Sequence, residues 1–138
     1  MNNIKARSFV VIMIVIAMSA LVLRMLMGWF INMNIVQNES NAQSTLKLIS
    51  AALENYAKDN QGVYPVQFSV LTESKPPYLD KDYIKQSPIK GYDYDCTRLD
   101  ATGYSCYAFP TRCKLTGMSA FSVTTGNLLI SEDCDKKE

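Results

Sequence analysis

Histidine is absent from this chain of 138 residues. Its absence excludes serine or cysteine nucleophiles activated by an imidazole, and it excludes zinc sites with imidazole ligands. Acidic residues are also absent before Glu39, and the only charges in residues 1–36 are Lys5, Arg7 and Arg24. The other basic residues are nearly balanced by the 13 acidic ones. We therefore expect no nucleic-acid partner, because such a partner requires a surface with excess positive charge.

Catalytic motifs are lacking as well. Serine, lysine and aspartate are plentiful, but the chain contains no nucleophile elbow, phosphate-binding glycine loop or paired-carboxylate motif. A Ser-Lys dyad is the one catalytic arrangement that the sequence leaves open. We expect a protein that is not an enzyme, with no small-molecule substrate and with no cofactor other than the calcium ion considered below.

A long apolar segment, "SFVVIMIVIAMSALVLRMLMGWFINMNIV", covers residues 8–36 and carries one charge, Arg24. As a helix it reaches about 43 Å, more than the roughly 30 Å of a hydrocarbon core. A cleavable signal peptide has a shorter apolar core that ends at a small-x-small site. Met18-Ser19-Ala20 matches such a site poorly, and the apolar run continues beyond it. We expect a retained transmembrane helix over 8–36, with signal-peptide cleavage as the alternative.

The charges that flank this segment predict its orientation. Lys5 and Arg7 precede it, which favours a cytoplasmic leader over residues 1–7 and places residues 37–138 on the outer side of the inner membrane, in the periplasm. Arg24 lies about 24 Å along the helix from Ser8, so its guanidinium can reach the outer headgroups. We favour this interfacial role for Arg24 over a functional charge inside the membrane.

A second helix is predicted over residues 40–60. Its apolar positions Ala42, Leu46, Ile49 and Leu53 follow spacings of three and four, and polar residues such as Glu54 fall off this stripe. Gly62 suits the left-handed position after a helix end, so the helix should stop near residue 60 or 61. No proline or glycine cluster separates the two helices. We expect one rod, bent near Gly28 or in the polar stretch 32–41.

The remainder predicts a loop over 61–90 and four short strands within 91–131. Three prolines after Val66 mark the loop, whose apolar residues should pack on the helix stripe. The runs "YDYDC" and "YSCYAF" form one predicted hairpin, and "SAFSVTT" with "LLI" forms a second. The expected fold class is α+β, with a long helix packed on a small antiparallel sheet, since each has one apolar face to bury.

Four cysteines occur, all in the last 43 residues, and they predict two disulfides in an oxidising compartment. A hairpin centred near Ala101 places Cys96 opposite Cys106, which leaves Cys113 to pair with Cys134. Free thiols and another pairing are the alternatives.

The eight tyrosines either pack in the core or form a surface that binds sugar or peptide, and we favour the core. Asp93, Asp95 and Asp100 offer oxygen ligands that could gather around calcium. We favour the alternative in which the first two aspartates are the wet face of a strand, since no ligand-spaced run such as D-x-D-x-D-G is present.

This order of parts resembles the type IV pilin and type II secretion pseudopilin family. Three stretches look like its major-pseudopilin branch: the helix exit "YAKDNQGVYP", the loop "PPYLDKDYIKQSPIKGYDYD" and the ending "YAFPTRCKLTGMSAFSVTTGNLLI". The resemblance covers nearly the whole chain. It implies a pilin-like fold, in which an apolar helix continues into an amphipathic half that lies across a small sheet.

The cleavage region departs from the family pattern. Family members typically have a glycine before the cleavage point, an aromatic residue or methionine as the first mature residue, and a glutamate as the fifth. With Phe9 aligned as the first mature residue, the region Arg7-Ser8-Phe9 has serine in the glycine position, and Met13 takes the glutamate position. The resemblance therefore implies a degenerate prepilin motif and a minor or accessory subunit.

The function predicted from these features is assembly with other pilin-like subunits or with secretion-machinery proteins. Small residues in the membrane segment permit close approach of a neighbouring helix; they are Ala17, Ser19, Ala20 and Gly28. The alternative is a membrane-tethered extracytoplasmic module that binds a ligand or acts as a sensor.

Overall fold

The structure is a computed structural model that describes the backbone of residues 2–135 and the side chains from residue 9 to residue 135. The chain divides into two compact units, Met1–Asn34 and Ile35–Glu138. Its helices are α1 (Asn2–Asp59) and α2 (Val70–Glu73), and its strands are β1 (Tyr92–Asp100), β2 (Gly103–Pro110), β3 (Ser119–Thr124) and β4 (Leu128–Asp133). The α+β class predicted from the sequence is confirmed.

The first unit consists of α1 as far as Asn34. Its large apolar side chains between Phe9 and Met33 are 44–75% exposed. Helix α1 is not interrupted at Gly28 or in residues 32–41, so the predicted helix 40–60 is the C-terminal part of the same helix. The helix also includes the backbone of residues 2–7, where the sequence predicts a cytoplasmic leader.

The second unit begins at Ile35, the first buried residue of α1, two positions before the predicted boundary at residue 37. Beyond it, the predicted stripe of Ala42, Leu46, Ile49 and Leu53 is confirmed, because each side chain is at most 1% exposed. Burying one Leu or Ile side chain contributes about 1.5 to 3 kcal/mol. This stripe therefore supplies much of the energy that holds the helix to the rest of the unit.

Helix α1 ends at Asp59, within two residues of the predicted stop. The Gly62 N–H donates to the Ala57 carbonyl at 2.7 Å, the bond of a Schellman C-cap. Gly62 has the expected positive φ of 87°, and Gln61 also has a positive φ of 59°. The left-handed turn thus involves two residues, one more than the sequence predicts.

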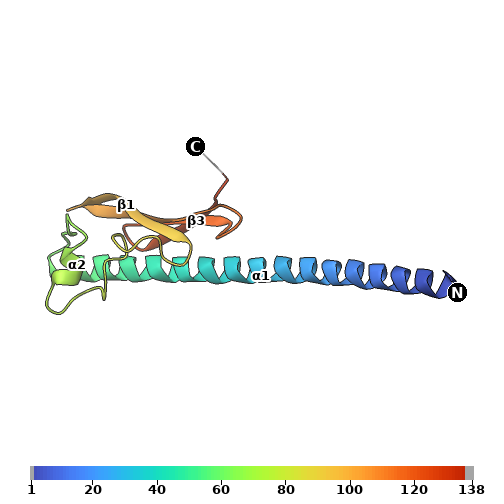
Figure 1. Ribbon diagram of the computed structural model, residues 1–138. Coiled ribbons are helices and arrows are strands. Elements are labelled where there is room, and N and C mark those ends of the chain that lie inside the picture. Colours follow the sequence, from blue (N-terminus) through green and yellow to red (C-terminus); the bar gives the residue numbers. More distant parts are fainter. Residues whose placement is uncertain (1, 136–138) are drawn as a thin grey trace. The chain divides into compact units, whose positions relative to one another are not determined.

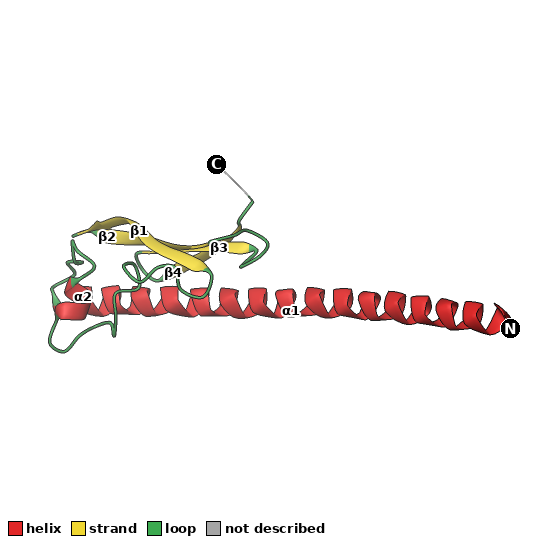
Figure 2. Cartoon of the chain, in the orientation of Figure 1, coloured by secondary structure: helices red, strands yellow, loops and turns green. Residues whose placement is uncertain are grey.

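The four strands form an antiparallel meander in the order β1-β2-β3-β4. One face of the sheet lies along the second-unit part of α1 (Figures 1 and 2). Its buried side chains are Tyr92, Tyr94, Tyr104, Cys106, Ala108, Phe121 and Val123. The segment between α1 and β1, which includes α2, contributes the buried side chains Phe68, Leu71, Leu79 and Tyr83. Strand β4 extends to Asp133, two residues beyond the predicted end of the strands.

The hairpin of β1 and β2 contains a bulge that the sequence does not predict. Asp100 pairs with Gly103, so the turn consists of Ala101 and Thr102, and the register shifts between Cys96 and Arg98. The extra residue of the bulge is Thr97. Without it, Cys96 would lie on the opposite face of the sheet from Cys106. The bulge restores the facing pair that the sequence predicts from a hairpin centred at Ala101.

Gly117 provides a test of the packing around the buried ring of Tyr92. A Cβ atom there would lie 2.6 Å from the Cζ atom of the buried Tyr92 ring. We expect Gly117→Ala to lower the free energy of unfolding by about 1 to 3 kcal/mol, measured by chemical denaturation of the full chain in detergent. Gly28→Ala is the control, because no atom lies within 4 Å of its Cβ position. Equal stability of both variants would contradict the packing described.

Candidate functional site

The most exposed apolar surface of the protein is the first unit. Among the residues that the structure describes, one helix is long and apolar enough to cross a membrane, with a mean hydropathy of 2.7 over its most apolar window. None of that window is buried. Exposed apolar surface on this scale marks contact with lipid or with other helices.

Three of the four predicted packing residues share one face of this helix. At about 100° per residue, Ala17, Ala20 and Gly28 fall within an arc of about 80°. Arg24 lies in the same arc, so the face combines small residues with the one charged side chain of residues 9–34. Ser19 lies about 160° from Ala17, and its hydroxyl donates to the Ile16 carbonyl at 2.8 Å. It does not extend the shared face.

The predicted cleavage region is only partly described. Phe9 and Met13 are exposed apolar residues on α1. The side chains of Arg7 and Ser8 lie outside the described residues. The degenerate processing motif therefore stays a prediction.

Two glutamates of α1 attach the sheet to the helix, and the sequence does not predict this role for either. The Glu54 carboxylate accepts hydrogen bonds from the Tyr64 hydroxyl at 2.9 Å, the Tyr104 hydroxyl at 2.9 Å and the Gly126 N–H at 2.8 Å. Beside it, the buried Ser50 hydroxyl lies 2.7 Å from the Tyr104 hydroxyl. These contacts join the helix to β2 and to the β3–β4 turn.

Glu39 makes the second attachment. Its carboxylate accepts from the backbone N–H groups of Met118 at 2.8 Å and Ser119 at 3.1 Å, where β3 begins. Tyr92 reinforces this point, because its hydroxyl donates to the Ser119 carbonyl at 2.7 Å. The position of Glu39 in the sequence could have indicated this role. Glu39 lies three residues before Ala42, on the face of the helix that carries the apolar stripe.

Burial changes the ionisation of the tyrosines at these attachments. Burial, followed by the hydrogen bond to Glu54, raises the pKa of Tyr104 to about 12. Burial also raises the pKa of Tyr92, and the nearby negative charge of Glu39 adds to the effect. Both hydroxyls therefore stay protonated and able to donate at neutral pH.

Both predicted disulfides are present. Cys96 is bonded to Cys106 and Cys113 to Cys134, so no cysteine is free. The second bond joins the segment before β3 to the residue after β4. Asp135 lies near this bond, but the group of Cys113, Cys134 and Asp135 cannot bind a metal through thiolates while the sulfurs are bonded to each other.

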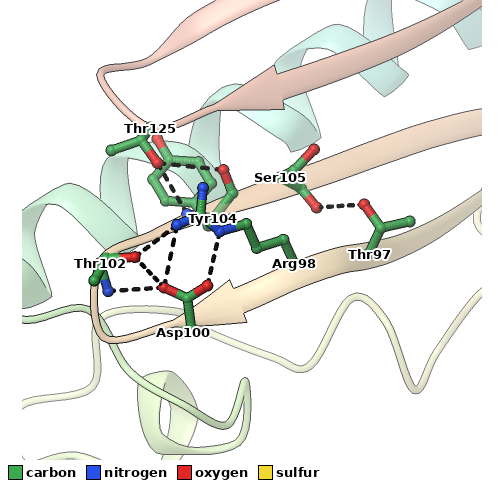
Figure 3. A network of polar contacts seen from close by, with 7 residues as sticks. All are labelled: Thr97, Arg98, Asp100, Thr102, Tyr104, Ser105 and Thr125. Carbon is green, nitrogen blue, oxygen red and sulfur yellow. Dashed lines mark hydrogen bonds and ion pairs between the residues drawn. The ribbon is translucent and has the colours of Figure 1, made fainter.

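The calcium alternative is not supported by the positions of its three aspartates. Asp93 and Asp95 are exposed on β1, and Asp95 accepts from the Tyr107 hydroxyl at 3.2 Å. Asp100 is engaged within its own turn, where Arg98 Nε lies 2.7 Å from its carboxylate and the Thr102 N–H donates at 2.8 Å (Figure 3). The Arg98 hydrogen bond is the main cause that lowers the pKa of Asp100. In the described part of the chain, the three carboxylates do not converge within ligating distance.

Three of the four tyrosines of the sheet lie in the core, as favoured from the sequence, whereas Tyr107 pairs with Asp95 on the outer face. Tyr92, Tyr94 and Tyr104 are at most 3% exposed, so they do not present a binding surface. A separate groove of about 440 Å³ lies between α1 and the loop before β1. It is lined by Leu48, Ala51, Ala52, Asn55, Tyr78, Leu79, Asp80 and Tyr83.

We find no protein-family model, curated protein or solved structure that matches this chain. The pilin and pseudopilin resemblance therefore remains a proposal.

Removal of the Glu54 charge tests the attachment of the sheet to the helix. We expect Glu54→Gln to lower the free energy of unfolding by about 2 kcal/mol, because the carboxamide cannot accept all three donors. The measurement is chemical denaturation of the full chain in detergent. Glu73→Gln, at an exposed position of α2, is the matched control and should change stability by less than about 0.5 kcal/mol. Equal effects would show that Glu54 is not an attachment point.

The raised pKa of Tyr104 predicts a loss of stability at alkaline pH. The pKa is 10.0 for an unperturbed tyrosine and about 12 for Tyr104 in the folded chain. The resulting stabilisation is complete below pH 10 and is lost as the pH rises toward 12, because the unfolded chain releases its proton first. We expect the denaturation midpoint to fall over this range, and to fall less steeply in Tyr104→Phe. Identical slopes in the two proteins would exclude this linkage.

Proposed function

We propose that the chain is a pilin-like or pseudopilin-like subunit of the inner membrane that acts by assembling with other pilin-like subunits or secretion-machinery proteins. Its N terminus lies in the cytoplasm and its second unit in the periplasm or another extracytoplasmic space. The resemblance in the order of parts supports this proposal. The α+β fold, with an apolar helix that continues into an amphipathic one beside a small sheet, is consistent with it.

The observation that carries the proposal is the exposed apolar surface of α1 between Phe9 and Met33. Transfer of each of its large side chains out of water contributes about 1.5 to 3 kcal/mol, so the segment as a whole strongly favours a membrane. Within lipid, association between helices depends on close packing and not on the hydrophobic effect. The arc of Ala17, Ala20 and Gly28 provides a surface for such packing.

The orientation is supported by charge and by cysteine chemistry. Lys5 and Arg7 favour the cytoplasmic side under the positive-inside rule. The two disulfides in the second unit are typical of an oxidising compartment outside the cytoplasm.

The methionine at position 13 is consistent with a minor or accessory role for this subunit. In this family the residue at that position is typically a glutamate, which is thought to pair with the N-terminal amine of a neighbouring subunit. Such a charge pair is strong within the membrane because the local dielectric constant is low. Methionine cannot form it, so the subunit would enter an assembly through apolar packing alone.

The alternative function, a membrane-tethered binding or sensory module, would use a ligand surface on the second unit. The buried tyrosines of the sheet weigh against the surface first suggested for it. The groove beside Tyr78 and Tyr83 is one place in the described part of the chain where such a ligand would bind.

Cysteine cross-linking in native membranes distinguishes assembly from solitary binding. We expect Ala17→Cys and Gly28→Cys, each labelled with a photo-cross-linker attached through the introduced thiol, to give cross-linked bands, either a homotypic ladder or products with pilin-like partners, because these positions share the packing face. All four native cysteines are in disulfides, so the introduced thiol is the reactive one.

Leu26→Cys is the matched control for this experiment. It lies at a depth similar to that of Gly28 but about 160° around the helix, and it should cross-link several-fold less. If neither Ala17→Cys nor Gly28→Cys gave a cross-linked product, the assembly proposal would be wrong.

A further inference from the structure

The sheet has two edges, β1 and β4, and they differ in how their backbone groups are satisfied. The outer edge of a strand presents unpaired N–H and C=O groups that can pair with another chain. Natural proteins usually block such edges with bulges, charges, proline or covering segments.

The β1 edge is blocked. The Tyr94 N–H donates to the Ser87 hydroxyl at 2.6 Å, and the Cys96 N–H donates to the carboxylate of Asp95 at 2.8 Å. The bulge at Thr97 then breaks the regular alternation of the strand. Few backbone N–H and C=O groups of β1 are therefore free and regularly spaced for pairing with another strand.

The β4 edge is open. All six of its residues, from Leu128 to Asp133, pair with β3 in an unbroken register. In an antiparallel pair, every second residue directs its N–H and C=O away from the partner strand. Within residues 2–135, no backbone hydrogen bond joins β4 to any segment other than β3. Five of its six residues are exposed, so neither a helix nor a loop covers the edge.

Strand β4 is also held at both ends. Before it, the Gly126 N–H is bonded to Glu54, and Asn127 accepts from the Ser50 hydroxyl at 2.8 Å. After it, Cys134 is buried, forms a disulfide with Cys113 and donates its N–H to the Met118 carbonyl at 2.9 Å. An edge that is already ordered loses little conformational entropy when a partner binds.

The side chains of β4 indicate what kind of strand would fit. Leu128 and Ile130 are 59% and 41% exposed on the face of the sheet that points away from α1, and Glu132 follows them on the same face. The strand contains no lysine or proline that would discourage pairing. Neither Glu132 nor Asp133 takes part in an ion pair with another described residue.

A second copy of this chain fits the edge poorly. Antiparallel pairing of two β4 edges keeps the outer faces of both sheets on the same side, so along residues 128–132 it would oppose Leu128 of each copy to Glu132 of the other. Parallel pairing of the two edges would turn one sheet over, so Glu132 of each copy would lie beside Asp133 of the other, and like charges at neighbouring strand positions are destabilising. The charge pattern therefore favours a different partner, with apolar residues at one end of its strand and a basic residue at the other.

We propose that the free edge of β4 is a docking site for an extended segment of a partner protein, which adds as a fifth strand and places a Lys or Arg beside Glu132. Main-chain hydrogen bonds would supply the affinity and the alternate side chains the specificity, as in other cases of strand addition. The β4 site does not include the membrane helix. If strand addition at β4 were disproved, the assembly proposal would still stand, and if assembly were disproved, the β4 proposal would still stand.

The test uses the full chain in detergent with two fluorescent peptides, Thr-Lys-Thr-Ile-Thr-Val-Thr for antiparallel addition and its reversed sequence for parallel addition. We expect one of them to bind with a dissociation constant on the order of 100 µM, as suits a small transient interface. Replacing its lysine with glutamate should weaken binding at least about tenfold through repulsion from Glu132.

Protein variants and hydrogen exchange locate the bound peptide. Ile130→Lys and Glu132→Lys should each weaken binding about tenfold or more, whereas Asp93→Lys, on the same face at the opposite edge, should not. In the unmodified protein, the peptide should slow hydrogen exchange at alternate amides of β4 and not in β1. This second measurement does not depend on whether the variants fold.

Several outcomes would overturn the proposal. These are the absence of saturable binding of either peptide at millimolar concentration, equal binding of the glutamate peptide, and protection in β1 instead of β4. Protection of β4 that appears when the protein concentration is raised without peptide would also overturn it, because the edge would then pair with a second copy.

Discussion

The second unit depends on one contact, the packing of the apolar stripe of α1 against the inner face of the sheet. Neither partner is stable by itself, because the helix needs a surface on which to bury Leu46, Ile49 and Leu53, and a four-stranded sheet needs cover for its tyrosine-rich face. A domain of this size buries only a modest core. The two disulfides supplement that core at the hairpin of β1 and β2 and at the end of β4.

Apolar packing brings the two layers together, but it is not directional. Hydrogen bonds are directional, so they specify the alignment of the sheet along the helix. Glu39 holds the start of β3, and Glu54 holds the β3–β4 turn. Because both acids belong to α1, the helix that carries the apolar surface of the first unit also orders the end of the sheet where the β4 edge is open.

The local elements of this protein could be predicted well from the sequence. The apolar stripe of α1, the glycine after its end and the two hairpins depend on residue spacing over short distances, and each is present in the structure. The two predicted cysteine pairs are also present, but Cys96 faces Cys106 only because of the bulge. The candidate sites could be predicted less well from the sequence. Ser19 falls on a different helical face from the other small residues, and Asp100 is engaged by Arg98, so the structure does not bring either one together with the residues first grouped with it. Whether a residue type at a plausible spacing meets its neighbours depends on the angles of the backbone.

The sequence by itself determined the apolar segment, the amphipathic helix and the α+β class, because periodicity and composition act locally along the chain. Only the tertiary structure decided the bulge at Thr97, the two glutamate attachments and the difference between the blocked edge of β1 and the open edge of β4. Each of these joins residues far apart in sequence or depends on a one-residue shift in strand register. Such a shift reverses the face on which every following side chain lies, and no local pattern records it.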